Sequence, residues 1–264
     1  MNLAPFIETA HILADAAGLL IRDAWVQDAT TTFKPDGSPV TPADMQVERR
    51  LRDILKARHP DHGVLGEEYG ADRRSSALTW VLDPIDGTRQ FAARLMNFGV
   101  LIALCADGVP VLGVIDQPLA KMRCIAAAGE GAWLNGRRLR SRAGVVLDRA
   151  AISLANPAAF DGAARPAFDA LAAQGALVVF DGGCVSYMAL AMGATDVCLN
   201  GFDLDPFDIC ALVPVVTEAG GRIAAWDRRP LTIDYAGGVV AAGSTALLDE
   251  TKAVMAEAAP GLVA

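Results

Sequence analysis

The sequence predicts an α/β protein built as an α+β layered sandwich: an antiparallel sheet with helices in the N-terminal half, and a mixed α/β layer in the C-terminal half. In the first half, amphipathic helical patterns are followed by a run of short apolar segments joined by turns. In the second half, short apolar segments alternate with helical patterns. At 264 residues the chain is long enough to bury a substantial core.

The N-terminal half opens with two predicted helices. From Pro5 to Trp25, apolar residues recur at helical spacing with charges between them. The segment from Asp28 to Pro42 is rich in Thr, Pro, Asp and Gly, which predicts a loop or a hairpin. A second helix is expected from about Pro42 to Arg58, because proline fits the first helical turn, where its missing N–H would have no partner.

Strands dominate the rest of this half. Val64-Leu65 predicts a short strand, and Thr79 to Leu82 predicts a buried strand that ends at Asp83. Further strands are expected at residues 98–105, 109–115 and 122–127, and turns at residues 129–136. The pattern implies a hairpin-connected sheet with helices on one face.

The C-terminal half alternates between the two kinds of element. Strands are expected at residues 152–154, 177–180, 197–199 and 239–242, and helices at residues 164–174, 185–192, 206–219 and 246–258. The pattern changes near residues 144–150, so we expect an N-terminal lobe of residues 1–148 and a C-terminal lobe of residues 149–264. No low-complexity linker separates the lobes, and we expect them to pack as one unit.

Composition argues against several classes of function. Acidic residues outnumber basic ones by 31 to 23 and no long Lys/Arg run occurs, so a nucleic-acid partner is not expected. The five cysteines lie in apolar stretches without a CxxC motif, which makes zinc a poor candidate and favours reduced thiols in the cytoplasm. The N-terminus is unlike a signal peptide and no stretch has transmembrane character, so no membrane partner is expected. We expect a homodimer.

The segment Asp83-Pro84-Ile85-Asp86-Gly87-Thr88 is the most informative in the chain. An apolar strand delivers Asp83, and Asp86 follows three residues later on what we expect to be a tight turn. Mg²⁺ prefers oxygen ligands, so two carboxylates with a carbonyl between them can hold one or two such ions. The N–H groups of Gly87 and Thr88 can then face a phosphate, particularly if a helix begins there. An ordinary Asp-Gly turn is the alternative interpretation.

Three further acidic sites are ambiguous when each is taken alone. Glu67 follows a short strand, where adjacent acids are usually just solvated. Asp44 stands in the first turn of a predicted helix, where Asp is common. Asp208 precedes an apolar helical stretch, where a helix N-cap is the ordinary explanation.

Taken together, these segments resemble the inositol monophosphatase family, a superfamily of lithium-sensitive, Mg²⁺-dependent phosphatases. The family's signatures appear in order: Asp44 after Ser38-Pro39-Val40-Thr41, then Leu65-Gly66-Glu67-Glu68, then Trp80 to Thr88, and then Asp208 followed by Thr217-Glu218-Ala219-Gly220-Gly221. Four motifs agree in order and spacing over about residues 5–250. The resemblance implies a sugar-phosphatase-like fold.

The resemblance also implies roles for particular residues. The family's Mg²⁺ ligands match Glu67, Asp83, the Ile85 carbonyl, Asp86 and Asp208. Its catalytic residues match Asp44, Thr88 and Glu67, with Asp44 and Thr88 as the pair that activates water. Its phosphate-binding amides match Gly87 and Thr88. We therefore expect a hydrogen bond from Thr88 to Asp44, and we do not expect Asp44 to bind the metal directly.

The chemistry is consistent without the name. A phosphate monoester carries about two negative charges at neutral pH, which repel a nucleophile, and clustered Mg²⁺ ions cancel that charge. Acyl transfer is not expected, because the chain has no Gly-x-Ser-x-Gly elbow. No Walker loop or dinucleotide fingerprint is present either. We expect a phosphatase that acts on a small phosphorylated metabolite.

Flanking residues are similar to the histidinol-phosphate phosphatases of this superfamily. They include Arg89 after Thr88, the segment Gly113 to Pro118, and the segment Pro206 to Val215. This similarity predicts histidinol phosphate as the substrate and a place in histidine biosynthesis. Hydrolysis of inositol 1-phosphate, or of another sugar phosphate or nucleotide, remains the alternative. A non-catalytic member of the family is a further alternative.

Two departures leave the substrate open. The branch usually has an acid where this chain has Gly183, and another where it has Gly201. Asp203 and Asp205 lie five and three residues before Asp208, and either is a candidate replacement, although both also have the character of turn residues, Asp205 directly before a proline. Arg89 is a further candidate for substrate binding.

Overall fold

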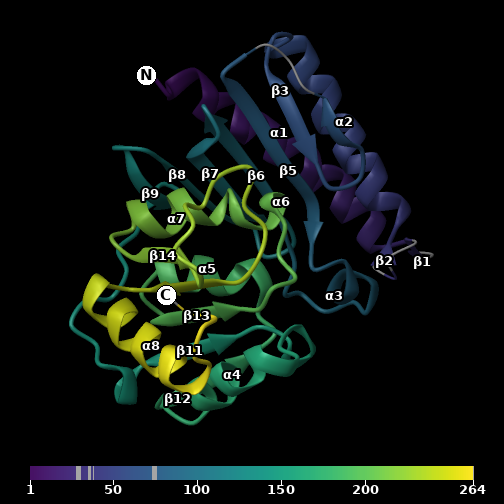
Figure 1. The fold of residues 1–264 in the computed structure, drawn as a ribbon. Helices are drawn as coiled ribbons and strands as arrows, with labels where there is room; N and C mark the ends of the chain where they lie inside the picture. Colours follow the sequence, from purple (N-terminus) through teal and green to yellow (C-terminus); the bar gives the residue numbers. More distant parts are fainter. Residues whose placement is uncertain (28–30, 35–36, 38, 73–75, 264) are drawn as a thin grey trace.

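The computed structural model describes residues 1–27, 31–34, 37, 39–72 and 76–263. Its elements form five layers (Figure 1). Helices α1 (Ala4–Trp25) and α2 (Pro42–Arg58) cover one face of an eight-stranded sheet. Between this sheet and a five-stranded sheet lie α5 (Gly183–Ala191), α6 (Pro206–Ile209) and α7 (Leu212–Glu218). Helices α4 (Arg165–Ala172) and α8 (Thr245–Ala258) cover the outer face of the second sheet. The layered α/β sandwich predicted from the sequence is therefore confirmed.

The two N-terminal helices match their predicted bounds closely. Helix α1 spans Ala4–Trp25 and α2 spans Pro42–Arg58. Before α2, β1 (Thr32–Phe33) pairs with β2 (Pro39–Val40) in the predicted hairpin region, whose residues 28–30, 35–36 and 38 lie outside the described residues. Helix α1 is long and apolar enough to cross a membrane by length and composition. In this structure it packs on β6 and β7, with one face buried in the core.

The large sheet has the order β10-β9-β8-β7-β6-β5-β3-β4 and is antiparallel except between β3 and β5. Its strands are β3 (Gly63–Gly66), β4 (Gly70–Asp72), β5 (Leu78–Asp86), β6 (Gly99–Ala106), β7 (Val109–Gln117), β8 (Met122–Ala127), β9 (Gly131–Leu134) and β10 (Arg137–Arg138). Helices cover both of its faces, because the C-terminal helices supply the second layer.

Strand β5 corrects the prediction that the strand ends at Asp83 and gives way to a tight turn. It continues to Asp86, with Asp83 opposite Leu101 and Asp86 opposite Gly99. Three steps along β5 therefore face two steps along β6, which is a β-bulge. A bulge accommodates Pro84 inside the sheet because it interrupts the ladder of hydrogen bonds there.

The sequence predicted only turns at residues 129–136, but the structure also has a strand there. Gly131–Leu134 forms β9, which pairs with β8, while Gly129, Gly131 and Gly136 all have positive φ. The strand was not predicted because the glycines at and around it are typical of turns.

The second sheet has the order β12-β11-β13-β15-β14. Its strands are β11 (Ala151–Leu154), β12 (Leu177–Phe180), β13 (Val197–Asn200), β14 (Arg222–Ala225) and β15 (Val239–Ala242). The central strand β11 is parallel to β12 and β13, and β15 is antiparallel to β13 and β14. The outer helices are α4 (Arg165–Ala172) and α8 (Thr245–Ala258).

The single helix predicted at residues 206–219 is two helices. Helix α6 spans Pro206–Ile209 and α7 spans Leu212–Glu218. Between them the backbone crosses β7 so closely that a Cβ at Gly113 would lie 2.2 Å from the Ala211 carbonyl oxygen. Only glycine fits at that crossing, and the close approach fixes where α6 sits on the sheet.

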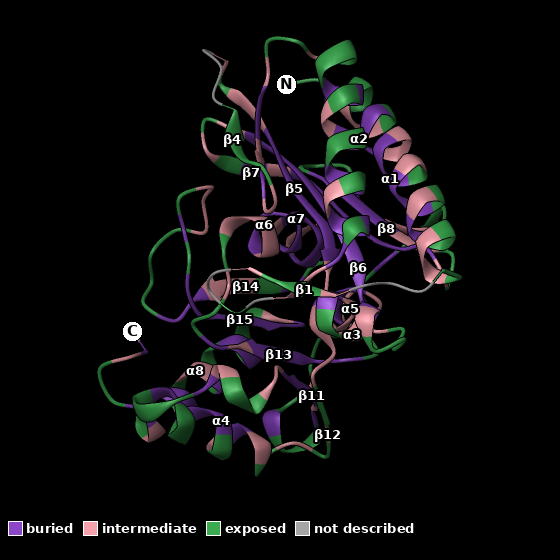
Figure 2. Cartoon of the chain, turned by 90° about the vertical axis from the view of Figure 1, so that its right-hand side faces the viewer, coloured by how far each residue is buried: buried purple, intermediate pink, exposed green. Residues whose placement is uncertain are grey.

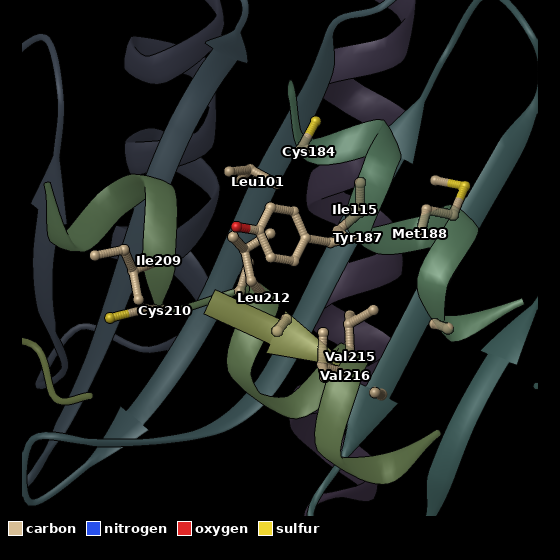
Figure 3. Close-up of a cluster of buried hydrophobic side chains, with 14 of the residues drawn as sticks. Leu101, Ile115, Cys184, Tyr187, Met188, Ile209, Cys210, Leu212, Val215 and Val216 are labelled. Atoms are coloured by element: carbon tan, nitrogen blue, oxygen red, sulfur yellow. The ribbon is translucent and has the colours of Figure 1, made fainter. Parts of the chain in front are cut away.

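The middle layer joins the two halves of the chain. Tyr187 of α5 (Gly183–Ala191) lies in a cluster with Leu212 and Val215 of α7 and Leu101 of β6 (Figure 3). Colouring by burial shows that both sheets are largely buried between their helical layers (Figure 2). The division at residues 148 and 149 stays a prediction, although β10 ends the first sheet at Arg138 and β11 opens the second at Ala151.

Candidate metal centre and active site

Three carboxylates predicted as ligands meet between the eight-stranded sheet and α6. One ligand oxygen from each of Asp83, Asp86 and Asp208 can be chosen so that all three lie within 4.8 Å of one another. Asp83 and Asp86 come from the bulged end of β5, and Asp208 comes from α6. Residues 125 positions apart in the sequence thus form one group of oxygen ligands because α6 packs on β5 and β6.

The bulge sets the direction of the two β5 carboxylates. The backbone N–H of Ile85 donates to Asp83 Oδ1 at 3.0 Å, and the N–H of Cys184 at the start of α5 donates to Asp86 Oδ2 at 2.9 Å. The Ile85 side chain is fully buried in the core on the α1 side of the sheet. Its carbonyl oxygen, the predicted fifth ligand, lies 3.1 Å from the Thr88 hydroxyl oxygen and is the alternative acceptor for the one proton that this hydroxyl can donate.

Asp208 is held by the cap of its own short helix. The N-cap residue is Asp205, whose backbone N–H donates to Asp208 Oδ2 at 2.7 Å. Asp208 itself stands three residues into the motif, so the N-cap explanation considered for it is wrong and applies to Asp205. One carboxylate oxygen is fixed by the cap, which orients the side chain.

Glu67 lies beside this group rather than within it. Its backbone N–H donates to the carbonyl of Leu82 at 3.2 Å, which holds it next to β5. Lys34 Nζ donates to Glu67 Oε1 and to Glu68 Oε1, both at 2.9 Å. Partial burial opposes the charge on Lys34, but these two carboxylates outweigh burial and raise its pKa. Nothing in the sequence identified Lys34, which is a lone lysine in a predicted loop.

The charges of the group repel one another. Burial raises the pKa of Asp83 well above its usual range, and the charges of Glu67, Asp86 and Asp208 raise it further. The pKa of Asp208 is also raised well above its usual range, by burial and then by Asp86. Among the described residues, no lysine or arginine forms an ion pair with Asp83, Asp86 or Asp208.

This donor set fits a hard divalent cation. All of its ligand atoms are oxygens, they converge to within 4.8 Å of one another, and positive charge would relieve their mutual repulsion. Asp83, Asp86 and Asp208 would hold such an ion, with Glu67 and the Ile85 carbonyl adjacent. A structural interpretation is weaker, because buried carboxylates that only stabilise a fold are usually paired with a cation.

Thr88 and Asp44 form the expected hydrogen bond. The Thr88 hydroxyl lies 3.2 Å from Asp44 Oδ1, which accepts, and Thr88 is mostly buried. Asp44 is fully buried in the first turn of α2, where Oδ2 accepts from the Thr41 N–H at 2.8 Å and the Thr41 hydroxyl at 2.6 Å. Burial raises the pKa of Asp44, while its Thr41 and Thr88 donors oppose the rise.

The predicted phosphate-binding amides begin a short helix. Gly87 is the N-cap of α3 (Thr88–Ala92) and has φ of 86°, a left-handed conformation that favours glycine. The N–H of Phe91 donates to the Gly87 carbonyl at 2.9 Å, which closes the first turn. The amides of Gly87 and Thr88 therefore lie directly after the Asp86 ligand.

The predicted substrate-side residues are less well placed. Arg89 and Asp205 are both exposed. A Cβ at Gly201 would lie 2.1 Å from the carbonyl oxygen of Ala159, so an acid cannot enter there without a backbone shift. The structure instead brings Asp181 beside α3, a residue that the sequence did not single out.

Volume alone does not locate this chemistry. A hollow of about 680 Å³ lies on the α1 side of the large sheet, lined in part by His11, Asp116, Arg123 and Trp133. None of the predicted site residues lines it. The carboxylate group is distinguished by its charges and its geometry instead.

Comparison with known proteins places the chain among phosphatases. The sequence pattern of the inositol monophosphatase family matches residues 2–260. The chain is 37% identical over 227 residues to a chloroplastic bifunctional phosphatase from Arabidopsis thaliana, which covers 85% of this chain but only 65% of that protein. It is 32% identical over 239 residues to a histidinol-phosphatase from Chlorobaculum parvum, covering 89% of this chain and 91% of the relative. An inositol monophosphatase from Zymomonas mobilis superposes with a TM-score of 0.88 at 36% identity, covering 97% of this chain and 99% of the other.

Proposed function

The chain belongs to the inositol monophosphatase family of phosphoric monoester hydrolases, and on this premise we propose that it is a Mg²⁺-dependent histidinol-phosphatase. The observation that carries the reaction type is the convergence of Asp83, Asp86 and Asp208 next to the Thr88–Asp44 hydrogen bond. A cation site and a group that can orient water thus stand side by side. Metal-assisted phosphate hydrolysis needs both of these elements.

The bound cation would cancel charge on the phosphate and make an attacking water more acidic. The protein's own contribution is orientation. The Thr88 hydroxyl donates to Asp44 Oδ1, which leaves an oxygen lone pair of Thr88 free to accept a hydrogen bond from water. As the water attacks, its proton passes to Thr88 while the Thr88 proton moves to Asp44, whose raised pKa makes it a competent acceptor.

The phosphate is placed by the start of α3. The left-handed Gly87 turns the chain so that the amides of Gly87 and Thr88 follow the Asp86 carboxylate directly. Backbone N–H groups at such a turn can bind phosphate oxygens. With a phosphate at these amides, Asp44 and Thr88 would orient the water that attacks it.

Relatives support the substrate. The Chlorobaculum relative, which matches over nearly its whole length, is a histidinol-phosphatase. Arg89 and the segments Gly113 to Pro118 and Pro206 to Val215 carry the same similarity. A second candidate is inositol 1-phosphate, which is favoured by the match to the Zymomonas inositol monophosphatase.

The test is phosphate release from histidinol phosphate, inositol 1-phosphate and fructose 1,6-bisphosphate, each with Mg²⁺ and with excess chelator. We expect no release in chelator, recovery on adding Mg²⁺, and the highest kcat/KM for histidinol phosphate. A higher value for inositol 1-phosphate would replace the substrate and keep the reaction. Full activity in chelator would refute the reaction itself.

We also propose a cytoplasmic homodimer. All five cysteines are free and buried, which agrees with a reducing compartment. The edge strand β12 exposes Leu177, Val179 and Phe180, an apolar edge of the kind that another chain can cover. Light scattering after size-exclusion chromatography tests this: a dimer mass is expected, and a monomer at micromolar concentration would contradict it.

A further inference from the structure

We propose that Asp181 is the carboxylate that binds the cationic group of the substrate, the ammonium or imidazolium of an amino-alcohol phosphate. The inference rests on the proposed function and names a specificity residue for it. It accounts for how this chain could recognise a cationic leaving group although glycine stands at positions 183 and 201.

Asp181 lies in the short connection between β12, which ends at Phe180, and α5, which begins at Gly183. Its backbone N–H donates to the Leu154 carbonyl at 2.8 Å, continuing the β11–β12 ladder by one residue. Its φ is 56°, a left-handed conformation that aspartate tolerates better than most residues. The next residues, Gly182 and Gly183, line a small polar pocket together with Ser153 and Asn200.

Two side chains from the opposite lobe hold Asp181 in place. Gln90 Nε2 donates to Asp181 Oδ2 at 2.9 Å, and Asn97 Nδ2 donates to the Asp181 carbonyl at 2.7 Å. Gln90 belongs to α3, and its Oε1 would lie 3.3 Å from a Cβ placed on Gly87. One side chain therefore connects the phosphate-binding turn to Asp181. A ligand whose phosphate lies at Gly87 has the Asp181 carboxylate within reach of its other end.

Within the part of the chain that the structure describes, the charge of Asp181 has no cationic partner. Its Oδ2 accepts from a neutral amide, and among the described residues no lysine, arginine or histidine forms an ion pair with it. The residue is half-buried, and its charge acts on Asp86. A half-buried carboxylate held by a neutral donor attracts an organic cation more strongly than a solvated one does.

Other acids on this side are poorer candidates. Asp205 is exposed and caps α6, with its backbone N–H engaged by Asp208. At Gly183, where the branch usually has an acid, a Cβ would lie 3.3 Å from Asp86 Oδ2. A carboxylate there would face a proposed metal ligand directly, whereas Asp181 lies two residues earlier and is held by Gln90.

The experiment compares a charge change with a tether change. Asp181→Asn removes the charge, keeps an acceptor for Gln90, and suits the left-handed backbone. Gln90→Ala removes the tether and keeps the charge. Asp249→Asn removes one exposed carboxylate on α8 as a control for net charge. The quantity is the ratio of kcat/KM for histidinol phosphate to kcat/KM for inositol 1-phosphate.

We expect Asp181→Asn to lower this ratio at least about tenfold, with the change mainly in KM, because one charge contact of this kind is worth about a factor of ten or more. Gln90→Ala should change the ratio less than about threefold, and Asp249→Asn should leave it unchanged. An unchanged ratio in Asp181→Asn, or an equal loss for both esters, would assign Asp181 a purely structural role and overturn the proposal.

A binding measurement separates this inference from the proposed function. Titration calorimetry with L-histidinol, in the presence of Mg²⁺ and inorganic phosphate, should show at least about tenfold weaker binding to Asp181→Asn than to the unmodified protein. If no ester is hydrolysed but this difference is found, the proposed function fails and the cation subsite stands. Equal binding to both proteins would overturn the subsite, whatever the activity.

Discussion

The buried carboxylate of Asp196 and the carboxylates around Asp83 have opposite electrostatic surroundings. Asp196, directly before β13, is fully buried and paired with Arg142, whose Nε donates to Oδ1 at 2.8 Å; Oδ2 accepts from the Ala151 N–H at 2.7 Å. Asp83 is equally buried and accepts from the backbone N–H of Ile85, but four neighbouring carboxylates raise its pKa: Glu67, Asp86, Asp208 and Asp44. A buried charge with complete partners supports the fold, whereas buried charges that repel one another mark a site that needs a cation from outside.

The largest effect on activity is expected when one of the mutually repelling carboxylates is removed. Asp83→Asn should lower phosphate release about a thousandfold or more, because a ligand and its charge are lost. The same change removes electrostatic repulsion, so the free energy of unfolding in chelator should stay equal or rise. Denaturant unfolding in chelator and phosphate release in Mg²⁺ measure the two. A large loss of stability in chelator would mean that Asp83 supports the fold as Asp196 does.

Removing the water-orienting hydroxyl should have a smaller effect. Thr88→Ala removes the donor to Asp44 and is expected to lower kcat about a hundredfold. The metal ligands remain, so the Mg²⁺ concentration for half-maximal activity should change only a few-fold. If Mg²⁺ binding by calorimetry weakens as much as in Asp83→Asn, the separation between water orientation and metal binding is wrong.

The smallest effect on activity is expected at Asp196, the carboxylate that is paired with Arg142. Asp196→Asn keeps an acceptor for the Ala151 N–H but breaks the ion pair with the half-exposed Arg142. We expect the free energy of unfolding to fall by about 1–3 kcal/mol, with kcat/KM nearly unchanged. Thermal unfolding and a steady-state assay on one preparation measure both. A collapse of activity without loss of stability would place Asp196 in the functional group and remove the contrast.

The sequence was informative where a pattern is local. The helices at residues 4–25 and 42–58 follow from apolar spacing and, for the second, from a proline in its first turn. The residues proposed to bind the metal stand in short motifs at the ends of such elements, and the resemblance of those motifs to a known family pointed to them. Both kinds of signal depend on a few consecutive residues, so they survive without knowledge of the tertiary structure.

Predictions failed where distant segments decide the outcome. The strand was predicted to end at Asp83, before Pro84. In the structure β5 continues to Asp86 through a bulge, because it pairs with β6 on both sides of Pro84. The break between α6 and α7 coincides with the close approach of Ala211 to Gly113. Lys34 and Asp181 meet their partners across 33 and 91 residues, so no local pattern could have associated them with the site.

The account depends most on a divalent cation lying between Asp83, Asp86 and Asp208. Mn²⁺ takes the same oxygen ligands as Mg²⁺ and scatters anomalously, so diffraction from a crystal grown with Mn²⁺ and phosphate locates it directly. We predict an anomalous peak within coordination distance of all three carboxylates, with phosphate against the amides of Gly87 and Thr88. Manganese bound only elsewhere, with these carboxylates unliganded at saturating concentration, would contradict the account.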